Sequence, residues 1–172
     1  SGLASPLADH PVFAAATWTV TGTGDGAGSC NSTAHTCTTA RAALAAADPG
    51  DSITLSGSGT LTLTAGALIV TKSLTISGLG ADVLTVSGNS ASRVFEVGAG
   101  TTVAIGGLSV ASGRAPSGTC GDTTASCGGA IRNDGSLTLD GLVVRDSVAQ
   151  GTDSGGANGG PGGLGGGVYN AA

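Results

Sequence analysis

Residues 72–110 read KSLTISGLGADVLTVSGNSASRVFEVGAGTTVAIGGLSV and contain four short apolar runs, at 74–76, 83–86, 94–97 and 103–105. In each run, apolar residues alternate with polar or small ones, which is the period of a half-buried β-strand. Gly or Asn closes every run, so strands and turns alternate with no room for a helix. This pattern is typical of either a β-sandwich or a stacked solenoid.

Internal repeats favour the solenoid. SLTISGL at 73–79 is similar to TVAIGGLSV at 102–110 and to SLTLDGLVV at 136–144, and GGAIRN at 128–133 returns as GGGVYN at 165–170. The spacing between copies varies, as expected if loops of different length interrupt a constant unit. Aromatic residues make up only 2% of the chain, so its core must consist of thin layers of small aliphatic side chains. We therefore predict an all-β fold, a right-handed parallel β-helix (solenoid) with a short N-terminal capping helix.

The one helix is predicted at 38–48, where TTARAALAAAD is rich in Ala, begins with Thr39 as N-cap and stops at Pro49-Gly50. Such a helix would cover the first edge of the stacked strands. The chain then divides into an N-terminal arm with a first strand, a disulfide loop with the capping helix, and β-helix coils without a C-terminal cap, at 1–22, 23–51 and 52–172.

The four cysteines form two close pairs, Cys30 with Cys37 and Cys120 with Cys127. Neither pair has the CxxC spacing or a pair of His ligands, so a zinc site fits poorly. Free thiols in a cytosolic protein are the other alternative. We predict two local disulfides, which imply an oxidising compartment.

The charge and the termini bear on location and partners. The net charge is −5 and Lys72 is the single Lys, which argues against nucleic acid or an anionic membrane as a partner. The chain has no Met and no apolar stretch long enough to span a membrane. We expect an extracellular or cell-surface protein whose signal peptide has been removed, with no cofactor.

Charged residues gather only weakly. The densest group is spread along predicted turns and outward strand positions, with no Asp pair and no nearby His, and consists of Arg132, Asp134, Asp140, Arg145 and Asp146. Glycoside hydrolysis needs paired carboxylates and calcium needs clustered oxygen ligands. We predict a solvated charged face, with no catalytic residue and no metal site.

Two sets of polar residues have regular positions. Outward threonines, a candidate ice-binding array, are Thr54, Thr60, Thr62, Thr64, Thr75 and Thr85. Threonine is also simply a good exposed strand residue. Turn asparagines that could stack as a ladder, or else lie exposed in solvent, are Asn89, Asn133 and Asn170.

The segments WTVTGTGDG, ARAALAAADPGDSITL, SLTISG, LTVSGNSASRVFEV, GGAIRNDGSLTLDGLVV and GGGVYN follow one another along the chain. In this order they resemble the N-terminal part of bacterial secreted or cell-surface right-handed parallel β-helix repeat proteins that open with a Cys-Ser-Leu-Arg-Glu-Ala motif. Cys37 and Arg41 match that motif, whereas its Leu and Glu are absent. The resemblance implies the solenoid fold and a secreted or surface protein; it assigns no activity.

The last repeat, at 165–170, is followed by no cap, and an uncapped strand edge invites another strand. We predict a non-catalytic extracellular structural or adhesive protein that polymerises head-to-tail into a filament or sheath, with surface glycans as a further partner. The candidate assembly residues are Val12, Phe13, Trp18, Val20, Val168, Tyr169 and Asn170. The alternatives are a fragment of a longer solenoid, the N-terminal part of a carbohydrate-active lyase or hydrolase, and a Thr-array ice-binding protein.

Overall fold

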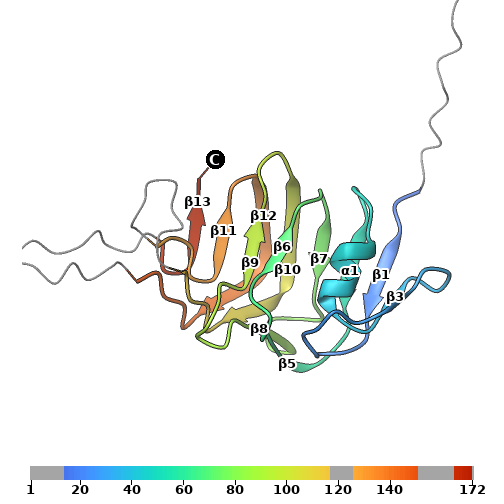
Figure 1. Cartoon of the computed structure of the whole chain (residues 1–172), viewed down its shortest axis with the longest axis horizontal. Helices are drawn as coiled ribbons and strands as arrows, with labels where there is room; N and C mark the ends of the chain where they lie inside the picture. Colours follow the sequence, from blue (N-terminus) through green and yellow to red (C-terminus); the bar gives the residue numbers. More distant parts are fainter. Residues whose placement is uncertain (1–13, 117–125, 151–164, 172) are drawn as a thin grey trace, which may run out of the picture.

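The computed structural model describes residues 14–116, 126–150 and 165–171, which form thirteen strands and one helix (Figure 1). In chain order these are β1 Thr17–Val20, β2 Cys30–Asn31, β3 Thr36–Cys37, α1 Ala40–Ala46, β4 Ser52–Leu55, β5 Gly59–Thr62, β6 Leu68–Val70, β7 Thr75–Ser77, β8 Leu84–Ser87, β9 Phe95–Val97, β10 Thr102–Ala111, β11 Ile131–Asn133, β12 Ser136–Arg145 and β13 Val168–Asn170.

The first sheet has nine strands in the order β2-β3-β1-β4-β7-β10-β8-β5, and β12 pairs with the other side of β10. Strands β1, β4, β7, β10 and β12 pair in parallel one after another. Their register places equivalent core residues directly above one another, in the column Trp18, Ile53, Ile76, Ile105 and Leu139. The repeated apolar positions of the sequence therefore pile up in one column.

Strands β10 and β12 are long because each bends at a glycine and continues into a second arm. Gly107 and Gly141 have φ of 62° and 56°, the left-handed region in which glycine is favoured. A Cβ on Gly107 would lie 2.8 Å from the carbonyl oxygen of Gly78, so the close approach also requires glycine. Beyond the bend, β10 pairs in parallel with β8, which pairs with β5.

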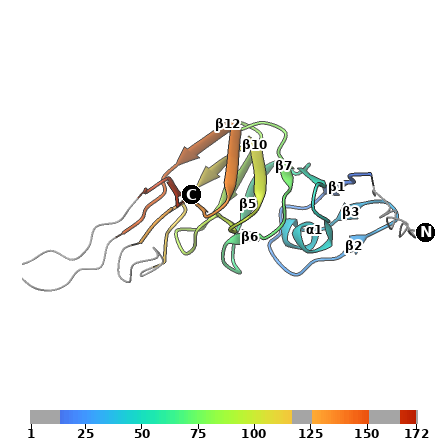
Figure 2. The ribbon, with the colours of Figure 1, turned by 90° about the horizontal axis from the view of Figure 1, so that it is seen from above.

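The second sheet has four parallel strands in the order β13-β11-β9-β6. Its inward column is Leu68, Phe95, Ile131 and Val168. The inward side chains of both sheets belong to one hydrophobic cluster, which runs from Trp18 to Ile131 and is mostly aliphatic. Figure 2 shows the strands stacked along the long axis, with α1 and β1–β3 at one end and β12 at the other.

The predicted right-handed parallel β-helix is wrong. The first sheet is mixed, because β2 and β3 form an antiparallel hairpin and β3 then pairs in parallel with β1. The architecture is a mixed nine-stranded sheet and a separate parallel sheet with one helix, which a continuous right-handed winding does not describe. The hairpin lies in the Ser/Thr-rich segment 23–37, where no alternation of apolar residues indicates a strand.

Helix α1 begins where the sequence predicts, after Thr39. The hydroxyl of Thr39 accepts a hydrogen bond from the N–H of Ala42 at 3.2 Å, as an N-cap does. Ala40 and Ala43 are buried, and α1 packs against β1, β3, β4 and β6. Because Ala is small, the helix can lie close to Ile53 and Ile76 of the apolar column.

Candidate functional site: the open end of the sheets

The two sheets end on β12 and β13, and this surface is here called the open end. Inward side chains of β10 and β11 are fully buried, with Ile105 and Ile131 at 1% and 0% exposure. Their equivalents one layer on, Leu139 and Val168, are each 38% exposed. Among the described residues no strand pairs with the outer side of β12 or β13. The open end therefore presents core side chains to solvent.

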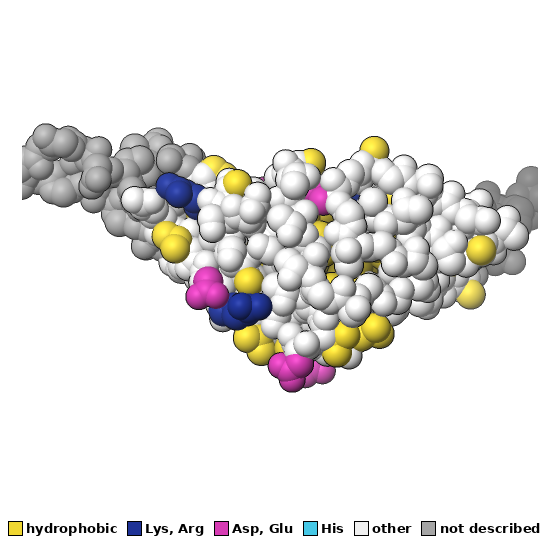
Figure 3. Space-filling model, turned by 90° about the horizontal axis from the view of Figure 1, so that it is seen from below, with side chains coloured by type: hydrophobic (Ala, Val, Ile, Leu, Met, Phe, Trp, Pro, Cys, Tyr) yellow, Lys and Arg dark blue, Asp and Glu magenta, His cyan; other side chains and the backbone are white. Residues whose placement is uncertain are grey.

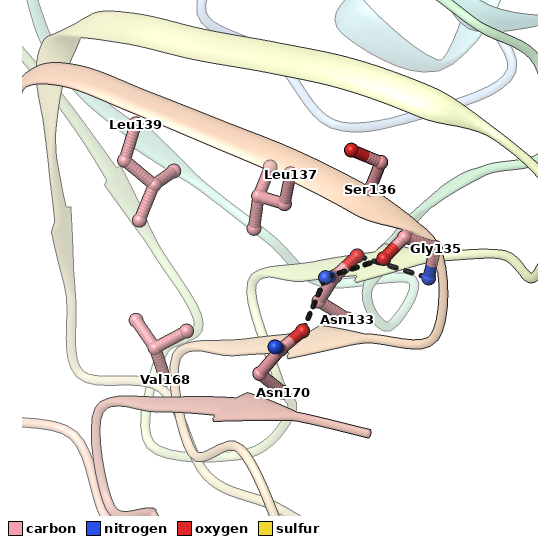
Figure 4. A pocket seen from close by; sticks show the side chains of 7 residues that line it. All are labelled: Asn133, Gly135, Ser136, Leu137, Leu139, Val168 and Asn170. Atoms are coloured by element: carbon pink, nitrogen blue, oxygen red, sulfur yellow. Dashed lines mark hydrogen bonds between the residues drawn. The ribbon is translucent and has the colours of Figure 1, made fainter. Parts of the chain in front are cut away.

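A pocket of about 380 Å³ lies in this surface between the last strands of the two sheets (Figure 4). Leu137 and Leu139 of β12 point toward Val168 of β13 across it, and Asn133 and Asn170 lie along one side (Figure 4). Its lining is apolar with a polar margin, and no described group of His, Cys, Asp and Glu could hold a metal ion here or elsewhere. The arrangement is suited to burying apolar side chains.

An asparagine pair orders the margin of the pocket. The side-chain amide of Asn133 donates to the side-chain oxygen of Asn170 at 2.6 Å and to the carbonyl oxygen of Gly135 at 2.8 Å. The N–H of Gly135 donates back to the side-chain oxygen of Asn133 at 3.1 Å. Of the two alternatives for the three asparagines, hydrogen-bonded stacking holds for Asn133 and Asn170, whereas Asn89 is exposed at a turn with φ of 56°.

Within the described residues, the backbone of β12 pairs along one of its two edges. Ser136 N–H donates to Thr101 at 2.8 Å, and the carbonyl oxygen of Arg145 accepts from Ser112 at 3.3 Å, so both ends of β12 face β10. Backbone groups of a strand point alternately to either side. The N–H and C=O groups of Leu137, Leu139, Leu142 and Val144 therefore face away from β10, along the open end.

The opposite end of the stack is closed. The hairpin β2–β3 pairs with β1, and α1 covers the core beside it. Asp51 fixes this end: its carboxylate accepts from the N–H of Ala16 at 2.7 Å, the N–H of Asp48 at 2.9 Å and the indole N–H of Trp18 at 3.0 Å. Burial alone would raise the pKa of Asp51, but these donors favour the charged form and the net pKa is lowered.

The structure separates the predicted assembly residues. Val12 and Phe13 lie outside the described residues. Trp18 and Val20 are core residues, 6% and 0% exposed, so their side chains offer no surface to a partner. Val168, Tyr169 and Asn170 form β13 at the open end, where Val168 and Asn170 are exposed and Tyr169 is half-buried. The sequence did not indicate that β12 completes this surface.

The predicted charged face consists of separate ion pairs. Arg132 contacts Asp134 at 2.9 Å and Glu96 at 4.0 Å, and Arg145 contacts Asp146 at 3.7 Å. Charged side chains are sparse on the face shown in Figure 3, which is mainly uncharged with small hydrophobic groups. Arg132, Asp134, Arg145 and Asp146 are therefore members of local surface ion pairs, and Asp140 is exposed on β12.

Two further ion pairs, each with one buried side chain, were not predicted. Arg93, 2% exposed, donates to the carbonyl oxygens of Gly128 and Cys127, each at 2.8 Å, and to the Glu96 carboxylate at 2.7 Å. Burial lowers the pKa of Arg93, and Glu96 offsets part of that effect. Arg93 therefore ties β9 to the turn before β11.

The second pair joins α1 to the turn after β5. The Asp25 carboxylate accepts from Arg41 and from the N–H groups of Thr64 and Ala65. Burial alone would raise the pKa of Asp25, but Arg41 and these N–H groups lower it below its usual value. Both pairs therefore hold the stack together, and the buried member of each has its hydrogen-bond partners within the chain.

The disulfide between Cys30 and Cys37 is confirmed and joins β2 to β3. Cys127 is disulfide-bonded as well, and Cys120, its predicted partner, lies outside the described residues.

The threonine array is divided between two arms of the first sheet. Thr54 and Thr75 belong to β4 and β7, whereas the threonines of the second arm are Thr60, Thr62 and Thr85.

Comparison with protein-family models, with curated proteins and with solved structures finds no match to this chain. The family resemblance read from the sequence accordingly stays a prediction. In the described part of the chain, no helix has the length and apolar character needed to cross a membrane.

Proposed function

We propose that this chain is a non-catalytic extracellular structural or adhesive protein that associates through the free β-strand edge of its open end. The observation that carries the proposal is the exposure of core-type side chains on β12 and β13, where the preceding layer is fully buried. Covering this surface removes apolar area from water, at roughly 25 cal/mol per Å². A free strand edge also supplies backbone hydrogen bonds to a partner strand.

The remaining features support a structural role. The disulfide in the β2–β3 hairpin is the kind of bond that persists in oxidising compartments. The buried charges of Asp25, Asp51 and Arg93 all have hydrogen-bond partners within the chain, so their pKa shifts have a structural cause.

Light scattering coupled to size-exclusion chromatography tests the association over a concentration series. We expect a mass above the 16.0 kDa of one chain that increases with concentration. Leu139→Lys and Val168→Lys place a charge in the open end and should return the chain to a monomer. Ile69→Lys is the matched control, because Ile69 is 58% exposed on β6, outside the open end, and should leave association unchanged.

A wild-type chain that stays monomeric at every concentration would overturn the association. Cleavage of acidic polysaccharides by the purified chain, with or without Ca²⁺, would overturn the non-catalytic part. Circular dichroism of each variant establishes that the Lys substitutions leave the fold intact.

A further inference from the structure

The geometry points to a second copy of this chain as the partner, joined end to end by antiparallel pairing of β12 with β12 about a two-fold axis at Asp140–Gly141. This inference rests on the proposed function and specifies its partner. It replaces the head-to-tail arrangement expected from the sequence with a closed dimer, in which the same surface is used on both copies.

The closed end explains why head-to-tail growth is disfavoured. A second copy stacked on that end would have to pair with β1, which already pairs with β3 over Thr19 and Val20. It would also meet α1, which lies over Ile53 and Leu68. The edges at that end that remain unpaired among the described strands are short, β2 with two residues, β5 with four and β6 with three, whereas β12 has ten. The only long free edge in the described structure is therefore that of β12 itself.

The backbone of β12 is complementary to itself. Its outward-facing backbone groups belong to Leu137 and Leu139 before the bend and to Leu142 and Val144 after it, as derived above from the contacts of Ser136 and Arg145. When a second β12 is laid antiparallel with its bend on the same axis, Leu137 opposes Val144 and Leu139 opposes Leu142 of the second copy. Both members of each pair direct N–H and C=O toward each other, which is the hydrogen-bonded pair of an antiparallel ladder.

The side chains agree with the same register. Side chains alternate between the two faces of a strand, and the bend at Gly141 shifts this alternation by one residue. The side chains of four β12 residues therefore point into the core and stack on buried residues of β10, namely Leu137, Leu139, Leu142 and Val144. A two-fold axis through the bend exchanges the two arms and keeps their inner sides together. The inward leucine and valine side chains of one copy therefore contact those of the other copy, and the aliphatic columns continue across the interface.

Charged residues lie at both ends of the paired strands and beside the two-fold axis. Arg145, 53% exposed, comes opposite Ser136 of the second copy, and its guanidinium stays with Thr85 and Asp146 of its own chain, so no like charge meets it at the ends of the paired strands. Asp140 lies next to the axis and approaches Asp140 of the second copy. Antiparallel addition to this sheet has a precedent in the chain itself, in the hairpin β2–β3.

A cysteine pair tests the register directly. The side chains of Thr138 and Val143 are exposed, and their backbone N–H and C=O groups point toward β10. In the dimer, Thr138 of one copy and Val143 of the other therefore form a non-hydrogen-bonded pair, whose Cα atoms are about 4.5 Å apart. That separation lies within the range of a disulfide. The variant Thr138→Cys/Val143→Cys is oxidised with copper phenanthroline in air, which takes the electrons as two thiols become one disulfide. No free cysteine of the described chain competes.

We expect covalent dimer from the double variant and none from Thr138→Cys or Val143→Cys alone, because each residue meets only the other type across the axis. Light scattering of the wild-type chain should plateau at twice 16.0 kDa. Association that grows beyond a dimer, or that gives no covalent dimer in the double variant, overturns the two-fold pairing and leaves the proposed association standing. A monomeric wild-type chain overturns both.

Discussion

Asn133 and Asn170 lie on neighbouring strands of the second sheet, and the side-chain amide of Asn133 donates to the side-chain oxygen of Asn170 at 2.6 Å. Asn133 is 3% exposed, whereas Asn170 is exposed at the open end. Asparagine therefore occupies equivalent positions in a covered layer and in the end layer. Replacing each asparagine in turn measures how much covering a layer adds to the stability of this contact.

Replacing Asn133 should cost far more stability than replacing Asn170. Asn133→Ala removes a buried side chain and leaves the half-buried backbone groups of Gly135 without their side-chain partner, which costs roughly 1–3 kcal/mol. Asn170→Ala removes an exposed side chain and should cost less than about 1 kcal/mol. Urea unfolding followed by circular dichroism measures both. Equal losses would show that the pair does not distinguish a covered layer from an end layer.

Asp51 predicts a specific sensitivity to acid. Its pKa is lower in the folded chain than the unfolded value of about 3.9, so its contribution to stability is complete above that pH and is lost as pH falls through the folded pKa. Asp51→Asn should lower the free energy of unfolding at pH 7 by roughly 2–3 kcal/mol, because a carboxylate with three donors is replaced. The variant should also lose less stability than the wild type below about pH 4.

The control for this experiment is Asp82→Asn, since Asp82 is exposed. It should keep the wild-type dependence of unfolding free energy on pH. An Asp51→Asn variant with an unchanged acid transition would contradict the assignment of that transition to Asp51.

Arg93 should be among the least replaceable charged residues. Arg93→Ala leaves the carbonyl oxygens of Gly128 and Cys127 without this donor and exposes a gap between β9 and β11, at a cost of roughly 3 kcal/mol or more. Arg114→Ala removes an exposed arginine and should change stability by less than about 0.5 kcal/mol. Thermal and urea unfolding compare the two. Arg93→Lys should recover only part of the loss, because Lys cannot donate to three groups in one plane.

Asp140→Asn should strengthen the dimer. The substitution removes the approach of two like charges beside the two-fold axis, and like charges across strands cost up to about 1 kcal/mol. The dissociation constant should fall roughly two- to five-fold, as measured by sedimentation equilibrium at low salt. Asp82→Asn, remote from β12 in the chain, should leave it unchanged. A weaker dimer in Asp140→Asn would place Asp140 in a favourable contact and contradict the proposed register.

The sequence predicted local structure better than sheet membership. Alternation of apolar residues places strands such as β7 and β9 correctly because it reports which side chains face a core. The alternation does not predict the hairpin β2–β3, because its residues are mostly polar and its strands are two residues long. That hairpin makes the first sheet mixed, so the predicted single winding was wrong.

The candidate site was predicted only in part, because the sequence indicates local repeats but not contacts between distant segments. The repeat GGGVYN indicated β13 by likeness to GGAIRN, but burial of Trp18 and Val20 depends on contacts with β3, β4 and α1 that lie far along the chain. Asp51 and Arg93 were missed because single charged residues in a sequence resemble exposed ones. A signal for Asp51 was its place directly after Pro49-Gly50 and before a strand, where a short carboxylate can accept turn N–H groups.

The disulfide between Cys30 and Cys37 has a consequence for how the chain matures. Four cysteines allow three sets of pairings, yet these two sulfur atoms belong to residues only seven apart. A loop of that size closes in about 10–100 ns, far faster than thiols exchange. Cys30 therefore meets its correct partner long before a distant cysteine can reach it, and the hairpin can be oxidised while the rest of the chain is still unfolded. Maturation of this end should not depend on an isomerase.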